Sequence, residues 1–78
     1  MKLPRGVPAE RLVAALEKTG YEVIRQKGSH VRLRHPGPPA HSITVPWHSP
    51  LKTGTLHGIL AEVARMRSTT VDALAALL

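Results

Sequence analysis

The spacing of apolar residues predicts a helix near the start of the chain, then strands, then more helix. In residues 8–20 apolar side chains recur every three or four positions, as on one face of a helix. Pro8 suits the first helical position, where its missing N–H needs no partner, and Gly20 is a typical residue just past a helix end. The predicted buried stripe consists of Ala9, Leu12, Val13 and Leu16. Residues 1–7 form a short basic leader that we expect to be loose.

A first hairpin follows this helix. Residues 21–25 largely alternate apolar and polar side chains, which is typical of a half-buried strand. Residues 26–28 fit a three-residue hairpin loop that ends with Gly28 in the left-handed conformation. This loop predicts the register of the hairpin, with Val23 opposite Val31, Tyr21 opposite Leu33, and Glu22 opposite Arg32.

A second hairpin turns through residues 36–40, Pro-Gly-Pro-Pro-Ala, which have too few N–H donors to continue a strand. Placing His35 opposite His41 gives strands of matching alternation on both sides of this turn. The inward pairs are then Leu33 with Ile43 and Val31 with Val45, and the outward pairs are Arg34 with Ser42, Arg32 with Thr44, and His30 with Pro46. Both hairpins put aliphatic residues on the same face of a three-stranded antiparallel sheet.

Helical spacing returns after residues 46–50, which end the sheet. We expect a second helix over residues 55–66, with a buried stripe of Leu56, Ile59, Leu60 and Val63. Thr69 and Asp72 resemble a capping box and predict a short third helix up to Leu78. The predicted fold class is therefore α+β, in the order α-β-β-β-α(-α), with helices on one face of the sheet and the other face open. We expect one domain over residues 1–78, with its core in residues 8–66 and a C-terminal helix in residues 69–78.

The charge is concentrated in the strands and the turns around them. The chain of 78 residues has a formal net charge of +6. Between Arg25 and Lys52 it has five Lys or Arg residues, four His residues and no Asp or Glu. Such a tract attracts polyanions, and a domain of this size has little room for an enclosed pocket, so an extended polymer is a better ligand than a small metabolite. With no cysteine and no apolar run of membrane-spanning length, we expect a cytoplasmic protein without a membrane partner.

The histidines do not form a pattern typical of metal ligands. His30 and His35 lie five positions apart on one predicted strand and so point to opposite faces, and no HExxH motif is present. We therefore expect no metal and no cofactor. A serine nucleophile is also unfavoured, because Ser29 and His30 are neighbours on a strand and no carboxylate lies nearby in the sequence to orient the ring.

RNA cleavage requires less of the protein, because the 2′-hydroxyl of the RNA itself is the nucleophile. His30, Arg32 and Arg34 share the open face of the predicted strand. An imidazole exchanges protons near neutral pH and is a suitable general acid or base, while Arg32, Arg34 and Lys27 can stabilise charge on the reacting phosphate. The same pattern also fits a solvated basic strand with an incidental histidine.

Two further segments are candidates for binding RNA. Residues 52–55, Lys-Thr-Gly-Thr, open a predicted helix, where backbone N–H groups and Lys52 can hold a phosphate; simple helix capping is the alternative. His41 and His48 are near the same region of the sequence as His30 and are candidates for a second proton-transfer group, although either can simply be solvated.

Four blocks of sequence resemble the HicA-type toxin (YcfA) family. They are residues 16–21 (LEKTGY), 25–30 (RQKGSH), 44–48 (TVPWH) and 51–56 (LKTGTL), in the order found in the family. The resemblance implies a double-stranded-RNA-binding-like fold and the toxin of a type II toxin–antitoxin system: a metal-independent endoribonuclease that cleaves mRNA and is neutralised by an acidic HicB-type antitoxin. It matches the catalytic histidine of the family to His30 and the motif glycine to Gly28, with Ser29 between them. The proline-rich turn at residues 36–40 and the tail at residues 68–78 depart from the family pattern.

Two other functions remain open on the sequence. A non-catalytic RNA-binding module of the same fold would bind RNA in a salt-sensitive way without cutting it. An interaction protein whose basic face meets an acidic partner would have no affinity for RNA at all.

Overall fold

The computed structural model describes residues 3–78 and consists of three helices and three strands. In chain order the elements are α1 (Ala9–Glu17), β1 (Glu22–Lys27), β2 (His30–His35), β3 (His41–Pro46), α2 (Thr53–Arg67) and α3 (Val71–Ala75). The strands form one antiparallel sheet in the order β1-β2-β3. This is the predicted α+β arrangement, and it is consistent with a double-stranded-RNA-binding-like fold.

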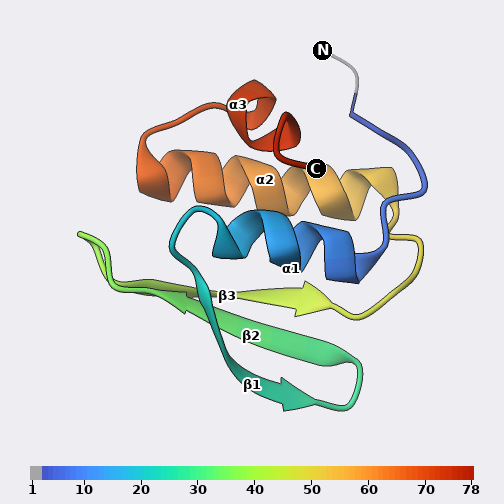
Figure 1. Ribbon diagram of the computed structural model, residues 1–78, viewed down its shortest axis with the longest axis horizontal. Coiled ribbons are helices and arrows are strands. Elements are labelled where there is room, and N and C mark those ends of the chain that lie inside the picture. The colour runs from blue at the N-terminus through green and yellow to red at the C-terminus, as the bar shows by residue number, and fades with distance from the viewer. Residues whose placement is uncertain (1–2) are drawn as a thin grey trace.

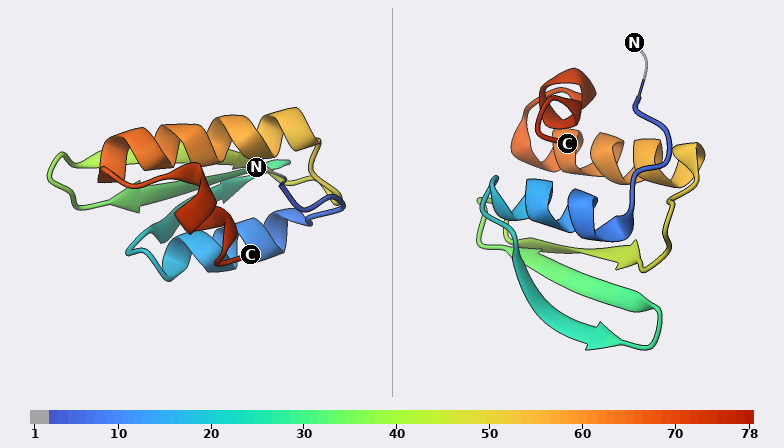
Figure 2. Two further views of the ribbon diagram at one scale, coloured as in Figure 1. Left: turned by 90° about the horizontal axis from the view of Figure 1, so that it is seen from above. Right: turned by 45° about the vertical axis from the view of Figure 1, so that its right-hand side comes forward.

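The helices lie on one face of the sheet and leave its other face open (Figure 1). α1 and α2 are side by side, and α3 lies across them on the side away from the sheet, as the view from above in Figure 2 shows. No helix in the described part of the chain, residues 3–78, combines the length and apolarity needed to cross a membrane.

The core lies between the sheet and the helices. It contains the predicted stripe of α1 and the predicted Leu56, Leu60 and Val63 of α2, while Ile59 is only partly buried. The expectation of a loose leader is wrong for Val7, which is 1% exposed and whose carbonyl accepts a 2.8 Å hydrogen bond from the Leu51 N–H. Met1 and Lys2 of that leader lie outside the described residues.

The register predicted for β2 and β3 is confirmed. His35 pairs with His41, Leu33 with Ile43, Val31 with Val45, and His30 with Pro46. Along β2 exposed and buried residues alternate strictly, with Val31, Leu33 and His35 buried. Because a shift by one residue would turn the buried side chains to solvent, the burial of one face fixes this register.

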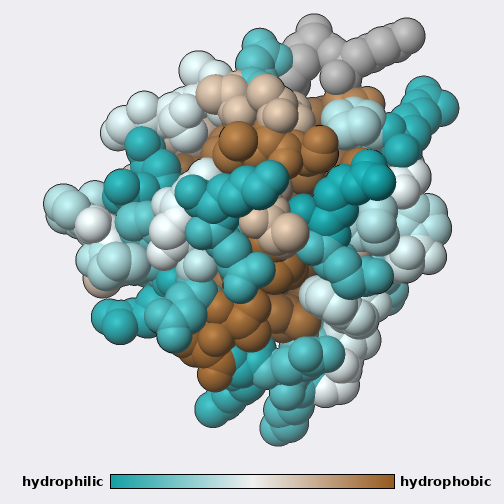
Figure 3. All heavy atoms as spheres, in the orientation of Figure 1, coloured by the Kyte–Doolittle hydropathy of each residue, from teal (hydrophilic) through white to brown (hydrophobic). Residues whose placement is uncertain are grey.

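The register predicted for β1 and β2 is wrong. Val23 pairs with Leu33, not with Val31, and the loop is the two-residue turn Gly28-Ser29, because Lys27 pairs with His30. A bulge between Val23 and Arg25 leaves Ile24 as the extra residue. β1 lies beyond the helices, so Val23 and Ile24 remain 38% and 50% exposed. In Figure 3 hydrophobic residues accordingly reach the surface below the helices, on the side of the sheet where β1 lies.

The later helices differ from the prediction at their ends. α2 begins at Thr53 instead of residue 55, so Thr53 and Gly54 belong to its first turn. It ends before Ser68, whose φ of 53° is left-handed. The N-cap of α3 is Thr70 and not Thr69, since the Thr70 hydroxyl accepts the Ala73 N–H at 3.1 Å. α3 stops at Ala75, earlier than predicted.

Three rings pack together where β2 ends and β3 begins: Tyr21, His35 and His41. His35 is 5% exposed, yet both of its ring nitrogens are bonded: Nδ1 accepts the Gly37 N–H at 2.9 Å, and Nε2 lies 3.1 Å from the Thr19 carbonyl. In this arrangement Nδ1 acts as the acceptor and Nε2 as the donor to the Thr19 carbonyl. Gly20 has a φ of 100°, and a Cβ there would lie 2.8 Å from Nε2 of His35, so glycine allows this close approach.

We predict that Tyr21→Phe flattens the loss of stability at alkaline pH. Burial raises the pKa of Tyr21 above its ordinary 10.0. The charge of Arg67 lowers this pKa and that of Glu62 raises it, both by smaller amounts. The folded state therefore favours the neutral phenol, so this contribution is complete below about pH 10 and declines as the pH rises through the pKa of the folded state. The phenol also bonds Nε2 of His41 at 2.5 Å, and its removal should cost about 1 kcal/mol at neutral pH.

Urea unfolding of both proteins between about pH 8 and about pH 11 measures this effect. Since Tyr21 is the one tyrosine of the chain, the wild type and the Phe variant differ in no other phenol. Parallel stability curves for the two proteins above pH 10 would contradict the prediction.

Candidate functional site

The open face of the sheet carries rows of side chains, each with one residue from every strand. The His30 row is Lys27, His30 and Pro46; the Arg32 row is Arg25, Arg32 and Thr44; the Arg34 row is Glu22, Arg34 and Ser42. Neighbouring rows lie about 7 Å apart, two residues along a strand. The face is therefore strongly basic on its β1 and β2 side and small and neutral on its β3 side.

The charges on this face have little internal compensation. Lys27, His30, Arg32 and Arg34 are all exposed. Within residues 3–78 the ion pair that forms is Arg65 with Glu62 on α2, at 2.7 Å, and no carboxylate pairs with a cation of the open face. The guanidinium of Arg32 donates instead to the Thr44 hydroxyl, at 3.4 Å. Cations that form no ion pair within the protein favour the binding of an anionic ligand.

The hairpin turn places His30 at the edge of this face. Gly28 has a φ of 56°, whereas Ser29 does not adopt a positive φ, a combination typical of the tight type II′ hairpin turn. The Ser29 carbonyl accepts the Trp47 N–H at 2.6 Å, which extends the contact between β2 and β3 past the last strand pair. His30 thus starts β2 directly after a turn that is fixed on one side by the pairing with β1 and on the other by the bond to Trp47. Its imidazole is exposed to solvent.

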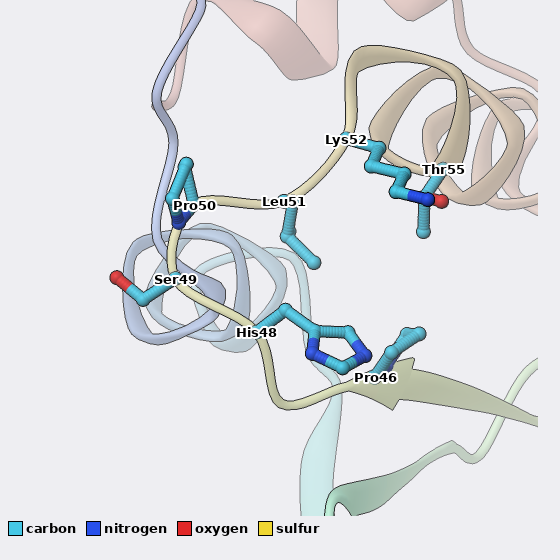
Figure 4. Close-up of a pocket in the computed structure, with 7 residues that line it drawn as sticks. All are labelled: Pro46, His48, Ser49, Pro50, Leu51, Lys52 and Thr55. Atoms are coloured by element: carbon cyan, nitrogen blue, oxygen red, sulfur yellow. The ribbon is translucent and has the colours of Figure 1, made fainter.

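A pocket of about 450 Å³ lies next to this corner, between the end of β3 and the start of α2. His48 and Lys52 line it together with Pro46 and Thr55 (Figure 4). The loop that carries them is fixed to the start of α1, because the His48 carbonyl accepts the Ala9 N–H at 3.1 Å. The predicted helix start at residues 52–55 is thus one wall of a real hollow in the surface.

Residues 9–64, well over half of the chain, match the family model described as the HicA toxin of bacterial toxin–antitoxin systems. The chain belongs to the HicA toxin family. No curated protein and no solved structure matches it significantly. Membership of the HicA family implies a cognate antitoxin as partner. Among residues 3–78 of this HicA-family chain, no three His, Asp or Glu side chains are grouped as possible ligands of a metal ion.

The HicA-family fold brings the residues selected from the sequence into two neighbouring groups. Lys27, His30, Arg32 and Arg34 lie on the open face, next to the turn formed by Gly28 and Ser29. His48 and Lys52 lie in the pocket, which His30 does not line. Pro46 belongs to both groups, since it pairs with His30 and lines the pocket.

His41 does not lie near His30 as the sequence suggested. It pairs with His35 at the opposite end of β2, about 17 Å along the strand. Its ring nitrogens contact the Tyr21 hydroxyl and the Pro39 carbonyl. His41 is therefore a structural residue of this HicA-family chain, and His48 is the nearer candidate for a second proton-transfer group.

Sequence analysis missed Arg25 as a residue of the open face. The predicted register put it on the core face with Tyr21 and Val23, but the bulge at Ile24 inverts the alternation and places it directly opposite Arg32. The apolar pair Val23-Ile24 at adjacent positions of an alternating strand is the one signal of a bulge in this segment.

Proposed function

We propose that this HicA-family chain is a metal-independent endoribonuclease that cleaves mRNA and that His30 is its general acid or base. The observation that carries the proposal is the position of His30: an exposed imidazole at the end of a basic face that no carboxylate neutralises within residues 3–78. The family match supports the same conclusion.

The reaction needs a nucleophile, which the RNA itself supplies, and two proton transfers. The RNA 2′-oxygen attacks the neighbouring phosphorus and loses its proton, the bond to the 5′-oxygen breaks, and this leaving oxygen gains a proton. The products are a 2′,3′-cyclic phosphate and a 5′-hydroxyl. His30 carries out one of the two proton transfers, and water or a second side chain such as His48 carries out the other.

The remaining site residues bind the RNA backbone in this proposal. Lys27, which pairs with His30, stabilises the negative charge that develops on the oxygens of the reacting phosphate, and Arg32 and Arg34 bind the backbone next to it. Lys52 and His48, which line the pocket beside Pro46, bind a part of the RNA backbone beyond the one at His30. The first backbone N–H groups of α2 are positioned to assist Lys52, because the first turn of a helix has no internal partners for them.

A HicB-type antitoxin is the proposed protein partner, and we propose that it covers the open face with His30. A basic face whose cations form no ion pair within residues 3–78 is complementary to an acidic surface of the antitoxin. The toxin then acts in the cytoplasm, where mRNA is available, as one domain over residues 1–78.

Incubation of the purified protein with a defined RNA in EDTA tests this function. We expect fragments that end in a 2′,3′-cyclic phosphate, and the same fragments without a chelator. Cleavage only after a divalent metal ion is restored would contradict metal independence.

The alternatives predict other outcomes of the same experiment. RNA that stays intact but is retained by the protein would indicate a non-catalytic binding module. The structure gives α2 few free cations for duplex recognition, because Arg65 bonds Glu62 and Arg67 bonds the Pro38 carbonyl at 3.3 Å. No RNA affinity even at low salt would indicate a pure interaction protein.

A further inference from the structure

Two arginines from neighbouring strands meet on the open face. Arg25 of β1 and Arg32 of β2 are directly paired in the ladder, so their Cβ atoms lie about 5 Å apart. Both side chains are exposed. The pairing depends on the bulge at Ile24, which puts Glu22 and Arg25 on the same face although they are three positions apart.

This arrangement is unfavourable for the protein alone. Like charges directly opposite each other destabilise a pair of strands. Arg32 has one side-chain partner within the described residues, the Thr44 hydroxyl, and Arg25 has none there. The nearest carboxylate in the ladder is Glu22, one row away, and it forms no ion pair with the arginines of this face.

An anion between the two guanidinium groups removes this repulsion. Each guanidinium offers a planar set of N–H donors that fits the oxygens of a phosphate. The Arg32 row is next to the His30 row, about 7 Å along the strands. That spacing is comparable to one nucleotide of an extended RNA backbone.

We propose that Arg25 and Arg32 together bind one RNA phosphate, the neighbour of the phosphate at which His30 acts. This inference rests on the proposed function and adds to it a phosphate-binding residue, Arg25, and a path for the substrate. The RNA backbone runs along β2 across successive rows. The Arg34 row, in which Glu22 replaces a cation, binds the next phosphate more weakly.

Binding of a short 2′-O-methylated oligoribonucleotide tests the shared phosphate, since this probe lacks the nucleophile and cannot be cut. We expect Arg25→Gln and Arg32→Gln each to weaken binding about tenfold. Each should also reduce the slope of log affinity against log salt concentration by the amount that corresponds to about one phosphate contact. The double variant should be only slightly weaker than either single variant, because both side chains hold the same group. Single effects that multiply in the double variant would overturn the shared phosphate.

Arg11→Gln is the matched control, because Arg11 is an exposed arginine on α1, away from the sheet. We expect it to change binding less than twofold. Arg25→Gln should also be at least as stable as wild type in urea at low salt, because it removes a repulsion. A clear loss of stability would show that Arg25 supports the fold instead.

The same measurements separate this inference from the proposed function. If wild type cuts RNA and Arg25→Gln behaves like Arg11→Gln, the phosphate site is wrong and the nuclease stands. If wild type binds the probe through Arg25 but leaves unmodified RNA intact, the phosphate site stands and the nuclease is wrong. A wild-type protein that neither binds the probe nor cuts unmodified RNA overturns both.

Discussion

His30→Ala will lower the rate of RNA cleavage by at least about 100-fold, and by up to about 10,000-fold, the range for one general acid or base. His30 starts β2 directly after a turn that is fixed by the bond between the Ser29 carbonyl and the Trp47 N–H, and this bond fixes the backbone from which the imidazole extends. Single-turnover cleavage of a defined RNA in EDTA measures the loss, because that rate reports the chemical step directly.

The fold and the partner should not respond to this change. His30 is exposed, and replacing an exposed side chain usually alters stability by less than about 0.5 kcal/mol. We expect the variant to bind the antitoxin and to retain most of its affinity for RNA. His57→Ala, which removes an exposed histidine of α2, is the matched control and should cut at the wild-type rate. If the His30 variant cut as fast as this control, the catalytic role of His30 would be excluded.

His35→Ala should have the largest effect on stability among the histidine variants, a loss of about 2–4 kcal/mol. The side chain is 5% exposed and connects the Gly37 N–H to the Thr19 carbonyl. Its removal leaves both backbone groups without this partner and opens a cavity beside Tyr21. Since a domain of this length has a total stability of about 4–12 kcal/mol, the loss is a large part of the whole.

Urea unfolding at neutral pH measures this loss as a shift of the midpoint. His57→Ala again provides the comparison, with an expected change of less than about 0.5 kcal/mol. Equal midpoints for the two variants would show that the three-ring cluster contributes nothing to the fold. RNA binding by folded His35→Ala should be preserved, because the side chain lies on the core face, away from His30.

The sequence predicts the β2–β3 hairpin correctly because one face of each strand is buried. Leu33 and Ile43 must both lie against the helices, so the register has one solution once the proline-rich turn is placed. β1 has no such constraint, since all six of its residues are exposed. The register of β1 depends on the turn at Gly28 and on a bulge. Because neither feature buries a side chain of β1, the hydrophobic pattern of the sequence does not reveal them.

The candidate site was likewise predictable from the sequence on β2 but not on β1. His30, Arg32 and Arg34 follow from the alternation of β2, whereas Arg25 depends on the bulge at Ile24. The pocket with His48 and Lys52 could not be predicted either. Its loop is held by backbone bonds to residues 7–9, and any sequence can form such bonds.

The bulge in β1 also affects how this edge of the sheet can pair with another strand. β1 is an outer strand of the sheet, and the unpaired backbone of an outer strand is a template on which a second copy can add. The extra residue at Ile24 interrupts the regular spacing of N–H and C=O groups, and Arg25 and Lys27 add like charges along the same stretch. These features disfavour the pairing of a second copy along the β1 edge, although Val23 and Ile24 are partly exposed there. The irregularity that builds the arginine pair thus also makes the β1 edge a poor template for a further strand.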